Sequence, residues 1–186
     1  MSKSSHENQH DKITTYRISS PEDDKKIAML LAQCFSNSPV YNYIVPYSYS
    51  SDERLKKLEY ILYSRLQVIR FMGGTVFGSY DQSGNCLATV SFGPVATTSP
   101  SFWVLLATGS LWAPFVLGFS DFQRILTVGE VMTQRCKMTG PSDYSVNMMV
   151  VHPDYQGKGM GTQLLKYALA SLSLEQVSSD SFPFLT

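Results

Sequence analysis

The fold of this chain is decided by one stretch, Val150-Val151-His152-Pro153-Asp154-Tyr155-Gln156-Gly157-Lys158-Gly159-Met160-Gly161-Thr162-Gln163-Leu164-Leu165. It runs from an apolar strand, through a glycine-rich turn, into an amphipathic helix. The first amides of a helix have no intrahelical acceptor, and they point along the positive end of the helix dipole. Glycines let an anion approach this backbone closely. The stretch therefore predicts a site for the diphosphate of a phosphorylated cofactor.

Two common glycine-rich loops do not fit these residues. A P-loop needs a glycine five residues before a Gly-Lys-Ser/Thr ending, but Lys158 is followed by Gly159, and position 152 is a histidine. A dinucleotide-binding fingerprint needs the spacing G-x-G-x-x-G, whereas the glycines here alternate along the turn. The pattern that remains is Gln156-x-x-Gly159-x-Gly161.

This remaining pattern resembles motif A (R/Q-x-x-G-x-G/A) of the GNAT superfamily, the Gcn5-related N-acetyltransferases, whose members bind the pyrophosphate of acetyl-coenzyme A there. The strand Val146 to Val151, the turn and Leu164-Leu165 resemble the small-molecule acetyltransferases related to puromycin N-acetyltransferase. The motif-level resemblance covers residues 144–169, and the order of the elements extends it to residues 12–186. A turn that serves only close packing of helix and strand is the alternative.

The resemblance implies a mixed α/β fold of the GNAT type, with a central, mostly antiparallel sheet flanked by helices. Local signals agree with that order of elements. Ser20 and Pro21 predict the start of a helix, Ser50 or Ser51 predicts the start of a longer one, and Asp81 to Asn85 predict a hairpin turn. The expected strands and helices are Ile13–Ile18, a helix to about Phe35, a helix to Gly73-Gly74, Thr75–Tyr80 and Leu87–Phe92.

The segment from Ser36 to Ser50 contains Pro39, Pro46 and several tyrosines, which favours an ordered loop over a helix. Its tyrosines Tyr41, Tyr43 and Tyr47 are candidates for the pocket of the acceptor. Rings that only fix the loop to the core are the alternative.

Phe102 to Phe119 is a run of residues without charge. Its length is at the lower limit for a membrane-spanning helix, but Gly109-Ser110 and Pro114 interrupt it and no basic cluster flanks it. We therefore expect two short buried helices, followed by a longer helix from Asp121 to about Met138. By the resemblance, the aromatic residues of this insertion contact the acceptor, although packing explains them equally well: Phe102, Trp103, Trp112 and Phe115.

The resemblance also assigns the cofactor contacts. The backbone amides of the turn hold the diphosphate, with the side chain of Gln156, the Thr162 hydroxyl and the charge of Lys158 nearby. The main chain of the last strand residues binds the pantetheine arm like an added strand, and an amide there polarises the thioester carbonyl for direct attack by an amine. The residues concerned are Met149, Val150, Val151, Gln156, Gly157, Lys158, Gly159, Met160, Gly161 and Thr162.

The sequence does not identify a catalytic base. An alkylammonium has a pKa near 10, so a base or a chain of waters helps to remove its proton. Glu130 is a candidate, although a carboxylate in the middle of a helix is more often solvated. Tyr144 and Asn147 are candidates for positioning a water, whereas His152 faces solvent in such turns and is not a candidate.

The composition narrows the remaining functions. A chain of 186 residues with 44% hydrophobic content and zero formal net charge is one ordinary domain and not a dedicated nucleic-acid binder. Its three cysteines lack metal-site spacing and indicate reduced, structural thiols in a cytoplasmic protein with no metal site. Met1 to Asp11 is expected to be a disordered tail, so that residues 12–186 form the acetyltransferase domain. The expected partner is a small-molecule amine, with no membrane partner.

Residues 181–186 resemble the start of a fifth strand, and the resemblance implies that a helix with an Asn-x-x-x-x-Tyr segment and two further strands would follow. That tyrosine usually protonates the departing coenzyme A thiolate, so we expect a C-terminally incomplete domain. Two alternatives to a small-molecule N-acetyltransferase stay open: a non-catalytic protein that binds acyl-coenzyme A or pairs with another subunit, and a protein N-acetyltransferase.

Overall fold

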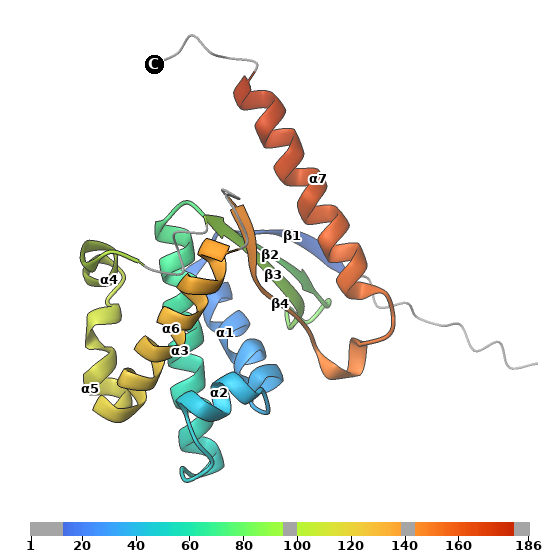
Figure 1. The fold of residues 1–186 in the computed structure, drawn as a ribbon. Coiled ribbons are helices and arrows are strands. Elements are labelled where there is room, and N and C mark those ends of the chain that lie inside the picture. The colour runs from blue at the N-terminus through green and yellow to red at the C-terminus, as the bar shows by residue number, and fades with distance from the viewer. Residues whose placement is uncertain (1–12, 95–99, 139–143, 181–186) are drawn as a thin grey trace, which may run out of the picture.

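The computed structural model describes residues 13–94, 100–138 and 144–180, and a four-stranded antiparallel sheet lies at its centre (Figure 1). The strands follow one another in the sheet in the order β1-β2-β3-β4. They are β1 (Thr14–Ile18), β2 (Thr75–Tyr80), β3 (Cys86–Pro94) and β4 (Tyr144–Val151). The expected mixed α/β fold, with an antiparallel sheet flanked by helices, is confirmed. Residues 1–11, expected to be a tail, lie outside the described residues.

Helices cover the two faces of this sheet differently. Helices α1 (Pro21–Phe35) and α3 (Ser51–Phe71) lie on one face, where fully buried residues such as Leu31 and Leu62 form the larger core cluster. Helix α7 (Met160–Asp180) lies on the other face (Figure 1) and packs Leu164 and Ala168 against Phe77 of β2. Since β2 and β3 are covered on both faces, nearly all of their residues are buried.

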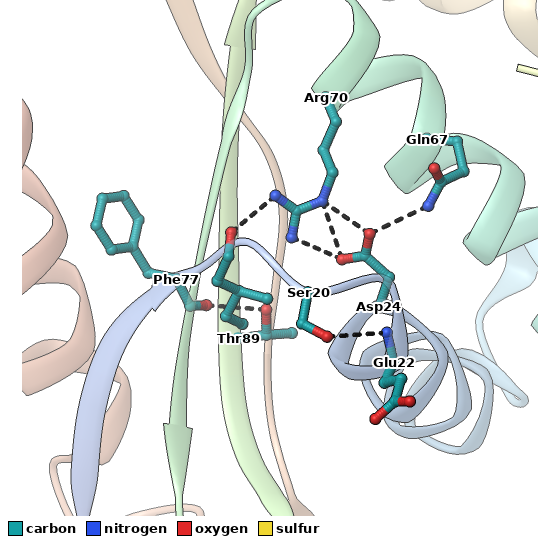
Figure 2. A network of polar contacts seen from close by, with 8 residues as sticks. Ser20, Glu22, Asp24, Gln67, Arg70, Phe77 and Thr89 are labelled. Carbon is teal, nitrogen blue, oxygen red and sulfur yellow. Dashed lines mark hydrogen bonds and ion pairs between the residues drawn. The ribbon is translucent and has the colours of Figure 1, made fainter.

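A polar network joins α1, α3 and the end of β1 (Figure 2). Asp24 is only 2% exposed, and its carboxylate accepts hydrogen bonds of 2.7 to 3.0 Å from the Arg70 guanidinium and one of 3.1 Å from Gln67. Arg70 also donates to the carbonyl of Ile18 at 2.7 Å. The Ser20 hydroxyl caps α1 by accepting from the amide of Glu22, as the sequence predicts. These contacts fix the two helices and the strand relative to one another.

The hairpin of β2 and β3 has the turn that its sequence predicts. The amide of Asp81 donates to the carbonyl of Asn85, and the Asp81 carboxylate accepts from both the amide and the side chain of Asn85. Gly84 takes a φ of 77°, a value that favours glycine. The hydrogen bonds from Asn85 lower the pKa of Asp81.

The ladder between β3 and β4 shifts register beside Asn147. Ser91 pairs with Met148, whereas Phe92 pairs with Val146, so Asn147 is the extra residue of a β-bulge. A bulge interrupts the regular alternation of side chains between the two faces of a sheet. The side chain of Asn147 accepts a hydrogen bond from Arg65 of α3, and Met148 packs into the core that α1 and α3 cover. The bulge explains how two neighbouring residues reach the same face of the sheet.

The segment expected to be a loop contains a helix instead. Helix α2 (Pro39–Ile44) begins with Pro39 at its first position, where a proline costs no hydrogen bond. Arg54 of α3 is buried and donates hydrogen bonds to three acceptors around this helix, namely the carbonyls of Val45 and Ser36 and the side chain of Asn42. The loop prediction was wrong because these tertiary contacts outweigh the local signals.

The charge-free run forms short helices, as expected, but they are not buried. It contains α4 (Phe102–Ala107), the 3₁₀ turn η2 (Ser110–Trp112) and α5 (Ala113–Leu117), and α6 (Phe119–Met138) follows. Ala113 and Leu117 are buried, whereas Trp103 is 73% exposed and Phe115 is 81% exposed. The burial prediction was wrong because α4 and η2 contain no buried residue and only Ala113 and Leu117 of α5 are buried.

One ion pair fastens this segment to α3. Asp121 at the start of α6 is fully buried, and it accepts a hydrogen bond of 2.9 Å from Lys57. Lys57 also donates to the carbonyl of Leu117 at 2.6 Å and lies 3.9 Å from the ring centre of Tyr49. Across the described ranges, no helix combines the length and the apolar character needed to cross a membrane.

Candidate functional site

The turn between β4 and α7 has the backbone geometry that an anion site needs. A short 3₁₀ turn, η3 (Pro153–Tyr155), leads into Gly157 with a φ of 74° and Gly159 with a φ of 77°, and α7 begins at Met160. A Cβ atom added at Gly157 or Gly159 would meet no atom within 4 Å. The backbone of this turn is therefore open to a ligand at both glycines.

The third glycine of the motif has a different role. A Cβ atom added at Gly161 would lie 3.1 Å from the end of Met149 and 3.3 Å from a methyl group of Val151. Gly161 thus allows the first turn of α7 to lie close against β4. The packing role proposed as the alternative for the motif applies to Gly161, whereas Gly157 and Gly159 are packed against nothing.

The turn is fastened to the end of β4 through one carbonyl group. Gln156 donates its side-chain amide to the carbonyl of Val151 at 2.9 Å, and the Cys34 thiol approaches the same oxygen at 3.9 Å. The amide of His152 donates to the carbonyl of Leu87 on β3 at 2.7 Å. Gln156 therefore positions the turn, and Cys34 links it to the end of α1.

A cavity of about 320 Å³ opens beside this junction. Among the described residues, its lining comes from the end of α1, from β4 and from the turn: Cys34, Phe35, Met149, Val150, Val151 and Gln156. β4 is the last strand of the sheet formed by the described residues, so its outer edge is not paired with another of these strands. Such an edge, next to a cavity, has the geometry to bind an extended ligand through main-chain hydrogen bonds.

A series of contacts connects the cavity wall to α3 and back to β4. Phe35 stacks on Tyr41 with ring centres 5.5 Å apart, and Tyr41 lies within the electrostatic influence of Arg65. Arg65 donates a hydrogen bond of 3.1 Å to the side chain of Asn147 in the bulge. Two predicted site residues are thus linked to Arg65, Asn147 by a hydrogen bond and Tyr41 by the effect of its charge.

The thiol and phenol groups near the cavity stay protonated at neutral pH. Burial raises the pKa of the Cys34 thiol. Burial also raises the pKa of the Tyr41 hydroxyl, and the charge of Arg65 offsets only part of this effect. Since the thiolate is the nucleophilic form of cysteine, Cys34 is poorly suited to attack a thioester.

Other predicted site residues lie apart from the cavity lining. Tyr43 is 52% exposed, and Trp103 and Trp112 are exposed on α4 and η2. Tyr47 packs on the guanidinium of Arg54, and Glu130 is exposed on α6. Their roles in binding the acceptor or in catalysis stay predictions. Tyr144 contributes its backbone to the start of β4, opposite Pro94.

The side chains of the turn face solvent. Lys158 is exposed and lies 5.1 Å from the ring centre of Tyr155, and Thr162 is exposed on the first turn of α7. His152 accepts a hydrogen bond from the amide of Asp154, so its ring caps η3. Met160 is buried in the core beneath α7, so only its amide is available as a ligand contact.

These features agree with a match between this chain and a known protein family. Residues 118–182, from the start of α6 to beyond α7, match the family model of the acetyltransferase (GNAT) domain. The match supports the GNAT superfamily. It includes β4, the glycine turn and α7, and it thereby supports acetyltransferase activity in general. No curated protein sequence matches the chain.

Sequence reasoning missed Arg65 and the position of Cys34. Arg65 lies on a helix whose apolar residues recur at helical spacing, and nothing in that pattern separates it from a solvated arginine. Cys34 was interpreted as a structural thiol, and only the fold brings it to Val151, which is 117 positions away in sequence. Within the described ranges, no group of three or more histidine, cysteine or acidic side chains is arranged to hold a metal ion.

Proposed function

We propose that this protein is an N-acetyltransferase that moves an acetyl group from acetyl-coenzyme A directly to the amine of a small-molecule acceptor. The observation that carries the proposal is the junction of β4, the open glycine turn and α7, with a cavity on its inner side. The match of residues 118–182 to the GNAT domain supports the same reaction class. The resemblance to enzymes related to puromycin N-acetyltransferase favours a small acceptor over a protein.

The residues of the turn fit a diphosphate. Gly157 and Gly159 leave space at the backbone, and the first amides of α7 lie at the positive end of the helix dipole. Lys158 supplies the cationic side chain of this turn. Acetyl-coenzyme A supplies an activated acetyl thioester. The outer edge of β4 from Met149 to Val151 would bind its extended arm and direct the thioester toward the cavity.

Direct transfer is favoured by the state of the cavity residues. Cys34 is the only cysteine on the cavity wall among the described residues, and burial keeps it in the thiol form. It therefore does not compete with the acceptor amine for the acetyl group. A main-chain amide of β4 at the bulge or beyond it would polarise the thioester carbonyl.

The proposal is tested by calorimetric titration of the protein with acetyl-coenzyme A, beside a matched pair of variants. Gly159→Asp places a carboxylate against the diphosphate, whereas Gly159→Asn has the same size and shape without the charge. Both residues tolerate the positive φ better than other side chains do. We expect micromolar binding by the wild type, and an affinity at least tenfold lower for Gly159→Asp than for Gly159→Asn.

A second readout locates the thioester. Acetyl-coenzyme A should slow alkylation of Cys34, measured by peptide mass spectrometry, if its arm lies along β4. Cys86 is the internal control, because it is buried away from the cavity and burial raises its pKa to about 12. No binding by the folded wild type would refute the proposal. Binding without transfer to any amine would favour the non-catalytic alternative.

A further inference from the structure

One side of the molecule carries a large exposed apolar surface. We call it the aromatic patch, and it consists of five residues in the segment from α4 to the start of α6: Phe102, Trp103, Trp112, Phe115 and Phe119. These side chains are between 59% and 81% exposed, and no charged residue occurs between Phe102 and Phe119. None of the five belongs to the described lining of the cavity beside the glycine turn, so that cavity does not explain their exposure.

The rings of the aromatic patch lie next to one another. The ring centres of Phe102 and Trp103 are 5.6 Å apart, and those of Trp112 and Phe115 are 5.8 Å apart. Helix α4 contacts η2, and η2 in turn contacts α5. Figure 1 shows α4 and α5 at the edge of the molecule opposite α7. The two ring pairs therefore belong to one continuous surface.

The other face of α5 is fastened to the body of the protein. Ala113 and Leu117 are four positions apart, so they lie on one face of the helix, and both are buried. The carbonyl of Leu117 and the carboxylate of Asp121 both accept hydrogen bonds from Lys57 of α3. Because these contacts hold the backbone that carries Phe115, the aromatic patch is preformed, and a partner would bind it at a small cost in chain ordering.

The aromatic patch is large enough to serve as an interface. An aromatic side chain offers about 150 to 250 Å² of surface, so at these exposures the five rings present on the order of 700 Å² to solvent. The largest apolar patch of a typical monomer covers about 300 to 600 Å². A stable complex buries about 800 Å² on each partner. The area of the patch is therefore closer to that of a stable interface than to that of an ordinary monomer surface.

The lack of charge favours a second copy of this chain over a lipid surface. In a contact with twofold symmetry the same surface lies on both partners, so a charge near the axis would face its own copy. The segment of the aromatic patch carries no such charge. Surfaces that bind membranes combine aromatic residues with lysines or arginines that attract anionic lipids. The cationic residue nearest to the patch in sequence, Arg124, lies 3.4 Å from the carboxylate of Asp121.

We propose that the aromatic patch is the interface of a reversible homodimer with twofold symmetry. Tryptophan and phenylalanine are enriched at the centres of such interfaces, where lysine, glutamate and aspartate are depleted. Contacts of this size span a wide range of affinities, and this one lacks charge pairs, so we expect a dissociation constant on the order of 10 µM. At about 1 µM the protein is then mostly monomeric, and unfolding measured there reports on the monomer with its patch exposed.

Sedimentation velocity of the full chain between about 1 and 200 µM tests the stoichiometry and the affinity. We expect a monomer at the lowest concentration and a dimer at the highest. The chain also contains its own reporter of the surface used, because its two tryptophans, Trp103 and Trp112, both belong to the aromatic patch. Their fluorescence emission should move to shorter wavelength over the same concentrations, and acrylamide should quench it less.

A matched pair of variants locates the interface. Phe115→Glu places a carboxylate in the aromatic patch, whereas Phe71→Glu makes the same substitution at a phenylalanine that is 58% exposed at the end of α3. We expect Phe115→Glu to raise the dissociation constant by about tenfold or more, because the carboxylate would lose water and approach its own copy. Phe71→Glu should leave the constant within about twofold of the wild type. Circular dichroism establishes that each variant is folded.

Several results would overturn the proposal. They are a wild type that stays monomeric at the highest concentration, association without a change in tryptophan emission, growth beyond the dimer, and equal effects of the two variants. Binding of a monomeric protein to vesicles of phosphatidylcholine and phosphatidylserine would assign the aromatic patch to a lipid surface instead. The emission of the wild type decides the matter even if Phe115→Glu fails to fold. None of these measurements involves acetyl-coenzyme A, so their failure leaves the proposed acetyltransferase function standing.

Discussion

Helices α1 and α3 and the segment from α4 to α5 are both rich in apolar residues, but they use them in opposite ways. Leu31, Leu58 and Leu62 of the first region are fully buried against the sheet. In the second region, Phe102, Trp112 and Phe115 are between 59% and 81% exposed. The second region lacks charged residues and is nevertheless the more exposed, so hydrophobic composition does not predict burial here, whereas contact with the sheet does. The end of α1 lines the cavity, whereas the segment from α4 to α5 lies apart from its described lining.

We expect the largest loss of stability from a substitution in the polar network of Asp24, which belongs to the buried region of α1 and α3. Replacing Asp24 with alanine leaves Arg70 without its carboxylate partner and leaves the side chain of Gln67 without an acceptor. Removing one partner of a buried ion pair costs about 3 to 5 kcal/mol. We expect a loss of this size in the free energy of unfolding, measured by urea titration.

Glu22→Ala is the matched control for Asp24→Ala, because Glu22 lies exposed in the first turn of the same helix. Its favourable interaction with the helix dipole is worth only about 0.3 to 1 kcal/mol. Equal losses for the two variants would show that the network in Figure 2 does not stabilise the α1 and α3 layer more than an ordinary surface charge does.

The sequence predicts local features of the fold better than features that depend on contacts between distant elements. Ser20, Ser50 and the turn from Asp81 to Asn85 were located correctly, because caps and turns are local hydrogen-bonding problems. The antiparallel sheet followed from the family resemblance. Helix α2 was missed because its order depends on Arg54, which belongs to the next helix, and the exposure of α4 and α5 depends on what the fold leaves uncovered.

The candidate site also contains parts that the sequence predicts and parts that it does not. The glycine turn could be predicted from the sequence, because positive φ angles and an open backbone need glycine at fixed spacing. The contacts of Arg65 and Cys34 could not be predicted, because their partners in β4 lie 82 and 117 residues away along the chain. Spacing within one motif thus predicts the backbone geometry of the turn, whereas the surroundings of the cavity come from the packing of separate elements.

A pair of leucines gives an intermediate effect and tests the comparison most directly. Leu62 of α3 is 0% exposed, and Leu106 of α4 is 51% exposed. Leu62→Ala creates a cavity in the core and should cost about 2 to 5 kcal/mol. Leu106→Ala removes the same atoms from a partly solvated position and should cost less than about 1 kcal/mol.

Because both leucines lie within helices, the intrinsic helix preference changes equally in the two variants, and the difference between them reports burial. Urea unfolding of both proteins under one set of conditions provides the measurement. A loss at Leu106 that matches the loss at Leu62 would show that α4 is covered in solution, and the contrast between the two regions would then fail.

A smaller effect than at Asp24 or Leu62 is expected at Lys57 of α3 and Asp121 of α6. Lys57→Met keeps most of the apolar stem and removes the ammonium, so the buried Asp121 keeps only longer contacts of 3.4 Å with Ser120 and Arg124. Since these partners remain, we expect a loss of about 1 to 3 kcal/mol, below the cost of fully breaking a buried pair. Lys56→Met is the control, because Lys56 is exposed on the same turn of α3.

The pH dependence of this loss identifies its origin. Burial disfavours the charged form of Lys57, but the hydrogen bonds and charges of Asp121 and Tyr49 together outweigh that effect and raise the pKa above its ordinary value of 10.5. A raised pKa means that the contribution to stability is fully present below 10.5 and falls only as the pH rises through the higher, folded-state value. The difference between wild type and Lys57→Met should therefore stay constant from pH 7 to about 9 and shrink only in stronger alkali. A difference that already declines between pH 7 and 9 would attribute the loss to another group, and hydrogen exchange in α5 and α6 would show whether these helices separate from α3 as a unit.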